Sequence, residues 1–280
     1  MKICAGIVSF NPNVERLRKN IESILPQVHK VFLVDNGSTE IDCINKMCND
    51  LKVELISLKE NTGIAHALNI LCNQSIKEGF DWILTLDQDS VVQDGMISTM
   101  EKYADLSSVG IVCPAIYYEG TGTCTKTDNE FEYVSACMTS ASLTNLQAFI
   151  KVGGFEEEYF IDYVDNEFCM KLTINGYKIV KVNECILSHE LGQYKEIKLF
   201  GVIHKKVFSH NPIRLYYIAR NYKVFIAKYK KYLCVPKELL KYQVVLFWEY
   251  LASANKKEAR AKIKLGIKHA KNSKMGKIEE

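Results

Sequence analysis

Short apolar runs alternate with amphipathic stretches of helical length over the N-terminal third of the sequence, and this alternation constrains the fold most. The apolar runs are residues 3–10, 30–35, 53–58 and 82–86, and the amphipathic stretches between them are residues 14–25, 41–51 and 64–78. Near-continuous apolar strands separated by helices indicate βαβ units and a parallel sheet with covered faces. We therefore expect a doubly wound α/β domain, in which ligands bind beyond the carboxyl ends of the strands.

Polar residues recur where these apolar runs end, at residues 9–11, 35–38 and 87–90. The last group is the most informative, because Asp87 and Asp89 are two carboxylates one residue apart after a buried strand. A hard divalent cation with oxygen ligands would neutralise both anions and keep positions open for phosphate oxygens. An ordinary strand-to-loop turn, in which Asp and Ser are common, is the alternative.

From residue 110 to residue 182 the sequence predicts a looser pattern of elements. We expect strand mixed with loop at residues 110–122 and 131–142, an acidic helix at 162–175 and a strand at 178–182. On such a helix Asp162 and Asp165 would share a face. An acidic helix N-terminus that complements the helix dipole is the alternative explanation for this cluster.

Beyond His189 the sequence is basic, aromatic and helical in pattern, and we predict a domain boundary that divides the chain into residues 1–211 and 212–280. The net charge is +3, yet residues 213–280 contain 17 Lys and Arg against 5 Asp and Glu. This mixture suits contact with the headgroups of an anionic membrane. Packing within the protein, or a homodimer through these helices, is the alternative. The usual signatures of nucleic-acid binding are absent from the sequence, so we expect no nucleic-acid partner.

The sequence predicts a cytoplasmic protein, in peripheral contact with the inner face of the cell membrane if the C-terminal region binds lipid. The apolar run at residues 3–8 is too weak for a secretory signal, and the longest uncharged stretch, residues 133–150, is rich in Ser and Thr. The ten cysteines are scattered without a Cys-x-x-Cys pair. We expect mostly buried free thiols.

Several motifs, in this order, resemble those of the family 2 inverting glycosyltransferases, and within them the bacterial rhamnosyltransferase-like group. They are VSFNP at 8–12, VDNGS at 34–38, ENTGIAHALN at 60–69, LDQDS at 86–90, GGF at 153–155, DYVDNEFC at 162–169 and HELG at 189–192. The resemblance covers roughly residues 2–225. It implies the GT-A fold of nucleotide-diphospho-sugar transferases, a Rossmann-like α/β architecture with a mixed, mostly parallel sheet, here with a C-terminal helical extension.

The resemblance places the base of a nucleotide-sugar donor at the ends of the first two strands. Asp35 would accept a hydrogen bond from the imide N–H of uracil or thymine, and Ser9, Asn11 and Asn36 would belong to the same donor site. A tight turn closed by the Asp35 side chain is the alternative, because Asp-Asn-Gly-Ser is a common turn sequence.

The diphosphate of the donor is expected at the start of the helix that follows residue 63. Asn61 and Gly63 precede this helix, whose free N–H groups suit a diphosphate, and glycine lets the backbone approach the ligand closely. An ordinary helix cap is the alternative. Asp87 would contact the ribose or the metal ion.

The resemblance assigns Asp89 and His189 as ligands of Mg²⁺ or Mn²⁺, a hard ion that would offset charge on the diphosphate leaving group. Without the resemblance, His189 could equally be a histidine of the core or the surface that binds no metal ion.

The general base implied by the resemblance is Asp165, which would take the proton of the acceptor hydroxyl as that oxygen attacks the anomeric carbon. Asp162 and Glu167 would supply like charge that raises its pKa. The family often has Glu immediately before this aspartate, but here Val164 occupies that position. The division of roles among the three carboxylates therefore stays open.

Two further residues are candidates for the sugar or acceptor site. Ser140 lies in a loop that lines the sugar site in the related enzymes, where the next residue is commonly Gly and here is Ala141. Arg220 lies in the helix that follows the catalytic segment and would meet the acceptor or the diphosphate. Packing of that helix against the core, with the arginine facing solvent, is the alternative for Arg220.

The resemblance implies a metal-dependent transferase that moves L-rhamnose from dTDP-β-L-rhamnose, or another hexose from a dTDP- or UDP-sugar, to a lipid-linked or growing cell-surface glycan. A UDP-hexose or UDP-N-acetylhexosamine transferase with the same site is one alternative. A catalytically silent nucleotide-sugar-binding protein is the alternative from another class. The charged residues Asp35, Asp89, Asp165 and His189 are all present, which argues against a catalytically inactive protein.

Overall fold

The computed structural model describes residues 1–189, 194–199 and 203–279, and the chain divides into two compact units. The first unit comprises residues 1–118, 122–160 and 164–189, and the second comprises residues 119–121, 161–163 and 190–280.

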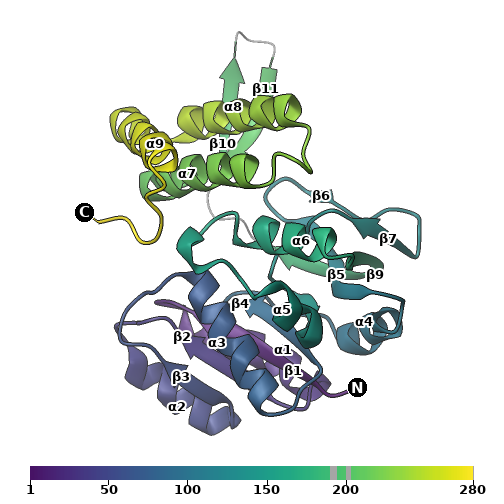
Figure 1. Ribbon diagram of the computed structural model, residues 1–280. Coiled ribbons are helices and arrows are strands. Elements are labelled where there is room, and N and C mark those ends of the chain that lie inside the picture. Colours follow the sequence, from purple (N-terminus) through teal and green to yellow (C-terminus); the bar gives the residue numbers. More distant parts are fainter. Residues whose placement is uncertain (190–193, 200–202, 280) are drawn as a thin grey trace. The chain divides into compact units, whose positions relative to one another are not determined.

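The first unit begins with the strands and helices that the alternating pattern predicts (Figure 1). They are β1 (Ile3–Ser9), α1 (Val14–Ile24), β2 (Val31–Asp35), α2 (Ile41–Leu51), β3 (Glu54–Ser57), α3 (Ile64–Lys77) and β4 (Trp82–Asp87). The four strands are parallel and lie in the order β3-β2-β1-β4. All residues of β1 and β2 are buried, which confirms a sheet covered on both faces.

The remaining strands of the first unit extend this sheet with mixed directions. They are β5 (Val109–Tyr118), β6 (Thr123–Cys124), β7 (Phe131–Val134), β8 (Ser142–Asn145) and β9 (Lys178–His189). β8 lies antiparallel between β4 and β5, whereas β5 and β9 are parallel. β7 is antiparallel to β9, and β6 is antiparallel to β5. The helices of this part are α4 (Met96–Ala104), α5 (Leu146–Val152) and α6 (Val164–Ile174).

Helix α1 shows why these residues form a helix at this place. The side chain of Asn13 caps it by accepting a hydrogen bond from the backbone N–H of Arg16 at 3.0 Å. Leu17, Ile21 and Ile24 recur at helical spacing and are fully buried in the hydrophobic core. Each such side chain contributes about 1.5–3 kcal/mol through burial, so α1 is held mainly by this apolar stripe.

The register of the parallel strands brings their polar ends to one edge of the sheet. Ser9 pairs with Asp35, and Val8 pairs with Asp87 on the other side of β1. The predicted site residues of these three strands therefore share the carboxyl edge, where ligands bind in sheets of this type.

The acidic helix predicted at 162–175 starts later than expected. α6 begins at Val164, and Asp162 and Tyr163 both have a φ of 65°, which is incompatible with a right-handed helix. Asp162 and Asp165 therefore do not share a helix face, and that prediction was wrong. Hydrogen bonds from the Asn221 side chain to the carbonyls of Ile161 (2.8 Å) and Asp162 (2.9 Å) hold this segment in its unusual conformation.

In its described residues, the second unit contains an antiparallel hairpin and three helices. The hairpin, β10 (Tyr194–Leu199) with β11 (Ile203–Phe208), lies in a region that the sequence predicts to be helical, so this part of the prediction was wrong. The helices are α7 (Pro212–Lys228), α8 (Val235–Ala252) and α9 (Lys256–Lys271), and they form the predicted C-terminal helical extension. Gly266 has no side chain, so the backbone of α9 approaches the carbonyl of Tyr216 in α7 closely. Among the described residues, we find no helix with the length and apolar character needed to cross a membrane.

Candidate active site

The carboxylate of Asp35 is buried at the end of β2 and is held by neighbouring hydroxyl and amide groups. It accepts hydrogen bonds from the Ser9 hydroxyl at 3.0 Å, from the Ser38 backbone N–H at 2.8 Å and from the Ser38 hydroxyl. The bonds from Ser38 close the tight turn that the sequence offered as the alternative role. Because a carboxylate has about four acceptor positions, the turn and a bond from a pyrimidine imide are compatible.

Asn36 connects the end of β2 to the loop that carries Asn61 and Gly63. Its side-chain oxygen accepts hydrogen bonds from the backbone N–H (2.9 Å) and hydroxyl (3.1 Å) of Thr62. Its side-chain nitrogen donates to the carbonyl of Gly63 at 3.2 Å and to the side chain of Asn61 at 3.3 Å. Asn36 is buried, and these bonds position the loop, so its contact with a donor stays a prediction.

Gly63 is required by the packing of the protein itself. Its φ is 92°, and a Cβ atom there would lie 2.6 Å from the carbonyl oxygen of Phe160. That carbonyl also accepts the backbone N–H of Ile64 at 2.7 Å, so one of the first N–H groups of α3 is already bonded. These contacts explain the glycine, and the expected binding of a diphosphate at Asn61 and Gly63 stays a prediction.

Asn11 helps to line a separate hollow at the same edge of the sheet. Its backbone N–H donates to the Ser38 hydroxyl at 2.8 Å, and its side-chain oxygen accepts from the Thr39 N–H at 3.0 Å. The hollow has a volume of about 210 Å³ and is lined by Asn11, Ser38, Thr39 and neighbouring residues. A donor that contacts Asp35 would have this space beside it.

The structure brings Asp89 and His189 close enough to influence each other electrostatically. Burial lowers the pKa of His189, the Asp89 carboxylate raises it, and the Arg16 guanidinium lowers it. The net direction is downward, so the imidazole is neutral at pH 7 and able to bind a metal ion. The Nε of Arg16 donates to the backbone carbonyl of Asp89 at 3.1 Å. The other residues of the HELG motif, 190–192, lie outside the described residues.

These side chains fit a hard cation only if the donor completes its coordination. Among the residues that the structure describes, no three His, Cys, Asp or Glu side chains are placed to hold an ion. Mg²⁺ is commonly held by one or two carboxylates together with substrate phosphates and water. Asp89 and His189 fit such a shared site, and Arg16 beside them would attract the same phosphates.

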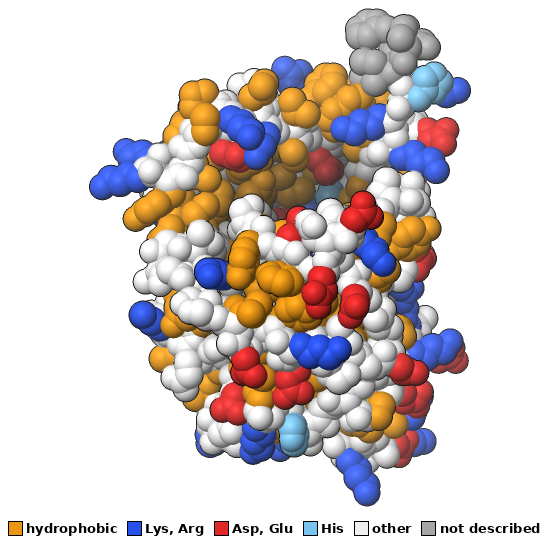
Figure 2. All heavy atoms as spheres, turned by 90° about the vertical axis from the view of Figure 1, so that its right-hand side faces the viewer, with side chains coloured by type: hydrophobic (Ala, Val, Ile, Leu, Met, Phe, Trp, Pro, Cys, Tyr) orange, Lys and Arg blue, Asp and Glu red, His pale blue; other side chains and the backbone are white. Residues whose placement is uncertain are grey.

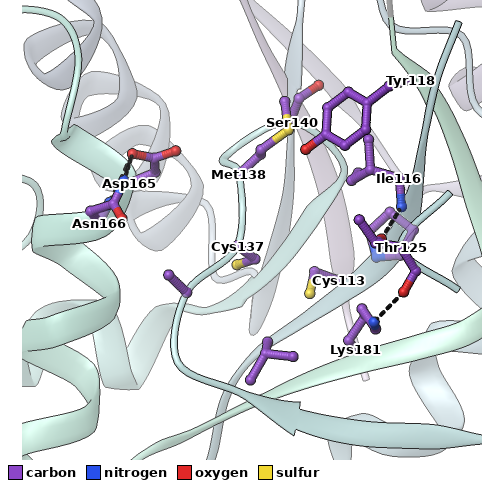
Figure 3. Close-up of a pocket in the computed structure, with 13 residues that line it drawn as sticks. Cys113, Ile116, Tyr118, Thr125, Cys137, Met138, Ser140, Asp165, Asn166 and Lys181 are labelled. Atoms are coloured by element: carbon purple, nitrogen blue, oxygen red, sulfur yellow. Dashed lines mark hydrogen bonds between the residues drawn. The ribbon is translucent and has the colours of Figure 1, made fainter. Parts of the chain in front are cut away.

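Asp165 lines a cavity of about 360 Å³ within the first unit (Figure 3). The backbone N–H and the side-chain amide of Asn166 both donate to Oδ1 of Asp165, at 2.8 and 2.9 Å, and fix the orientation of the carboxylate. In Figure 3, Asp165 and Asn166 lie on one side of the cavity, and Tyr118 and Lys181 lie on the other. The cavity therefore presents a carboxylate opposite the hydroxyl of Tyr118, whereas the Lys181 ammonium donates to the carbonyl of Thr125 at 2.5 Å.

Ser140 connects this cavity to the Asp-x-Asp segment. Its hydroxyl lines the cavity, accepts the backbone N–H of Asp87 at 3.1 Å, and shares a hydrogen bond with the Ser90 hydroxyl at 2.7 Å. The next residue, Ala141, has a φ of 58°, a conformation that favours glycine. This backbone geometry explains why related enzymes commonly have Gly at that position.

Three predicted candidates occupy other environments. Glu167 is fully buried in α6, and its carboxylate forms an ion pair with the Lys171 ammonium of the same helix at 3.4 Å. Asp162 forms a two-point ion pair with the Arg214 guanidinium in the second unit. Arg220 is fully buried there, donates to the carbonyl of Gly276 at 2.6 Å, and lies over the ring of Tyr217 at 5.0 Å from its centre. These contacts bury Arg220 within the second unit, so it does not face solvent as the alternative expected, and its contact with an acceptor or diphosphate stays a prediction.

Four site residues have no counterpart in the sequence prediction: Arg16, Tyr118, Asn166 and Lys181. Tyr118 ends β5 opposite His189 of β9, and the two rings are 6.4 Å apart in an edge-on arrangement. Arg16 could have been predicted as a site residue, because it follows shortly after the polar end of β1. Tyr118 and Lys181 gave no local signal, because only the pairing of β5 with β9 brings them to the cavity.

Comparisons with known proteins agree with this architecture. The model of the family described as Glycosyl transferase family 2 matches residues 4–156. The dTDP-rhamnosyl transferase RfbF of Shigella flexneri is 31% identical, with 78% of each chain covered.

Two solved structures share the fold at low sequence identity. One is residues 1–349 of S. aureus TarS in complex with UDP-GlcNAc, with a TM-score of 0.61, 15% identity, and coverage of 95% of this chain and 80% of that one. The other is GalNAc-T7 with UDP, GalNAc and Mn²⁺, with a TM-score of 0.56, 14% identity, and coverage of 68% of this chain and 44% of that one. The family match, the relative and the sheet topology together identify this chain as a GT-A-fold glycosyltransferase that belongs to glycosyl transferase family 2.

Proposed function

We propose that this glycosyltransferase moves L-rhamnose from dTDP-β-L-rhamnose to a lipid-linked or growing cell-surface glycan, with inversion at the anomeric carbon. The choice of donor is supported by the similarity to the dTDP-rhamnosyl transferase RfbF. A UDP-hexose or UDP-N-acetylhexosamine donor is the second candidate, because the TarS structure with the same fold holds UDP-GlcNAc.

The observation that carries this proposal is the double role of Ser140. Its side chain lines the cavity that contains Asp165, and it also bonds the backbone of Asp87 in the Asp-x-Asp segment. A diphosphate beside Asp87 and Asp89 would therefore have its sugar next to a cavity that contains a carboxylate. This is the arrangement that a single displacement at the sugar requires.

In this mechanism Asp165 acts as the general base. Its carboxylate takes the proton of the acceptor hydroxyl while that oxygen attacks the anomeric carbon from the face opposite the diphosphate. Asn166 holds Oδ1 of Asp165 in place through two hydrogen bonds, so the carboxylate does not need to reorient during the reaction. One displacement gives one inversion.

The donor is proposed to be held at the carboxyl edge of the sheet. Asp35 accepts the imide N–H of thymine, and Ser9 and Asn11 line the same edge. Asp89 and His189 would hold Mg²⁺ or Mn²⁺, which when bound supplies Lewis-acid assistance to the departing diphosphate. The positive charge of Arg16 beside Asp89 attracts the diphosphate to the same place.

A lipid-linked acceptor would place the enzyme at a membrane surface, and α8 offers a face for such contact. Leu240, Val244 and Phe247 follow one another at helical spacing and are 63%, 45% and 49% exposed. Lys237 and Lys241 are exposed on the same helix. Figure 2 shows hydrophobic side chains beside Lys and Arg side chains in the upper part of the view. Apolar groups flanked by lysines suit an anionic headgroup region.

Titration calorimetry with dTDP-β-L-rhamnose, dTDP and UDP-GlcNAc, each with and without Mn²⁺, tests the donor assignment. We expect the dTDP-sugar to bind more tightly than UDP-GlcNAc, and Mn²⁺ to strengthen binding. Tighter binding of UDP-GlcNAc would establish the second candidate in its place.

The metal assignment is tested by Asp89→Ala in the same experiment. The variant is expected to lose the increase in affinity that Mn²⁺ gives to the wild type, because Asp89 is the carboxylate proposed to bind the ion. Asp94→Ala is the matched control, since it removes an exposed carboxylate from the same loop. An Asp89→Ala protein whose affinity still rises with Mn²⁺ would rule out this metal site.

A further inference from the structure

Three cysteines from distant parts of the sequence form a cluster beside the cavity that contains Asp165: Cys113 and Cys137 line the cavity, and Cys169 lies next to Cys137. Cys113 lies on β5, Cys137 in the segment before β8, and Cys169 on α6. The sulfur atoms of Cys137 and Cys169 are 3.9 Å apart. Figure 3 shows the sulfurs of Cys113 and Cys137 between the two sides of the cavity.

The surroundings of Cys137 make it the reactive member of this cluster. Cys137 is partly exposed, whereas Cys113 and Cys169 are buried. Contacts with the thiols of Cys113 and Cys169 lower the pKa of Cys137, against the opposing effect of burial. The same contacts, followed by burial, raise the pKa of Cys113 and of Cys169. A thiolate is the nucleophilic form of cysteine, so Cys137 attacks an electrophile first.

We propose that Cys137 is an oxidation site in the sugar cavity, and that a hydroperoxide converts Cys137 and Cys169 into a disulfide that reversibly stops transfer. This inference stands on the arrangement of the thiols and does not depend on which sugar the enzyme transfers.

The two steps balance with a hydroperoxide as the oxidant. The Cys137 thiolate attacks one peroxide oxygen, the O–O bond breaks, and a sulfenic acid and a hydroxide or alkoxide ion form. The Cys169 sulfur then attacks the sulfenic sulfur, which forms the S–S bond and releases water. Two electrons pass from the thiols to the peroxide, and a dithiol reductant reverses the change.

Formation of the disulfide would alter the part of the cavity that holds the base. The two sulfurs must approach by about 1.9 Å to reach the S–S bond length. Cys169 lies one helical turn after Asp165 on α6, and the Cys169 sulfur is also 3.8 Å from the carbonyl of Cys137. A movement of this turn toward the Cys137 segment displaces Asp165 and narrows the cavity between them. Catalytic geometry is sensitive to shifts of about 1 Å.

The test begins with a background variant in which the exposed cysteines, Cys43, Cys124 and Cys234, are replaced by Ser. The reduced protein is treated with hydrogen peroxide, and its intact mass and tryptic peptides are measured. Trypsin separates the three cluster cysteines, because cleavage after Lys126 and Lys151 divides them among different peptides. We expect the loss of two hydrogen atoms and one cross-linked pair of peptides, containing Cys137 and Cys169.

Single variants in this background assign the order of events. Cys169→Ala should trap Cys137 as a sulfenic acid that dimedone labels, and Cys137→Ser should prevent the cross-link. Cys185→Ala, which removes a buried cysteine that does not line the cavity, should leave the cross-link unchanged. Donor turnover should fall with the extent of cross-linking and return with dithiothreitol.

A cross-link between Cys113 and Cys137, or peroxide consumption with no cross-link, would overturn the pairing. A Cys137–Cys169 cross-link that leaves turnover unchanged would overturn the effect on transfer. The peptide map is read without any assay of transfer, so these outcomes are distinct from a failure of the proposed sugar donor.

Discussion

Replacing Gly63 by Ala tests how the loop before α3 is built. The φ and ψ of Gly63 are 92° and 159°, a region that only glycine adopts readily. The new Cβ would meet the oxygen, a ring carbon and the Cα of Phe160 at 2.6, 2.7 and 2.9 Å. Two of these three are backbone atoms, so side-chain rotation cannot relieve the contact.

The expected cost has two parts. Backbone strain contributes roughly 1–3 kcal/mol, and overpacking against Phe160 contributes about 1–3 kcal/mol more. The free energy of unfolding should therefore fall by about 2–6 kcal/mol, a large share of the roughly 5–15 kcal/mol typical of a native protein. Gly79→Ala is the matched control, because Gly79 has a φ of 72° with no atom within 4 Å of the added Cβ. It should cost only about 1–2 kcal/mol.

Urea unfolding followed by fluorescence measures both changes. The sequence has two tryptophans, and Trp82 in β4 is the one in the first unit, so a Trp248→Phe background makes the signal specific for that unit. We expect the midpoint of Gly63→Ala to lie well below that of Gly79→Ala, at an unchanged m-value. Equal midpoints for the two variants would refute the packing account of Gly63.

Two further predictions concern the base and the surface of α8. Asp165→Asn should keep donor binding and reduce transfer by at least about a hundredfold. Glu167→Gln should mainly lower the stability of the fold, because Glu167 is buried beside Lys171. Wild-type transfer by Asp165→Asn, together with no transfer by Glu167→Gln, would show that Glu167 is the base. Replacing Leu240 and Phe247 by Ser should lower the fraction of the protein that floats with anionic vesicles at low salt. If the wild type does not float with the vesicles and is a dimer in solution, α8 would instead be a dimer interface.

The regular part of the fold could be predicted because its signals are local. The helices α1, α2 and α3 begin at the residues that the apolar spacing indicates, and β4 ends at Asp87. The polar edge formed by Ser9, Asp35 and Asp87 also follows from the sequence, since parallel strands bring their carboxyl ends together.

The errors arose where distant residues decide the local conformation. Asp162 looks like the start of a helix, but Asn221 and Arg214 of α7 hold it at a positive φ. Arg220 looks like a surface arginine, and it is buried because aromatic rings and the carbonyl of Gly276 surround its guanidinium. The thiol cluster is invisible in the sequence, because its members lie on β5, on α6 and in the segment between them.

The central claim is that the carboxyl edge of the sheet binds a nucleoside diphosphate through a metal ion, beside the cavity that contains Asp165. Crystals grown with dTDP and Mn²⁺ test it most directly, because manganese is located independently by its anomalous scattering. We expect an anomalous peak bonded to the Asp89 carboxylate and His189, with the thymine imide within hydrogen-bonding distance of Asp35. A nucleotide bound away from Ser9 and Asp35, or manganese that does not contact Asp89, would contradict this expectation.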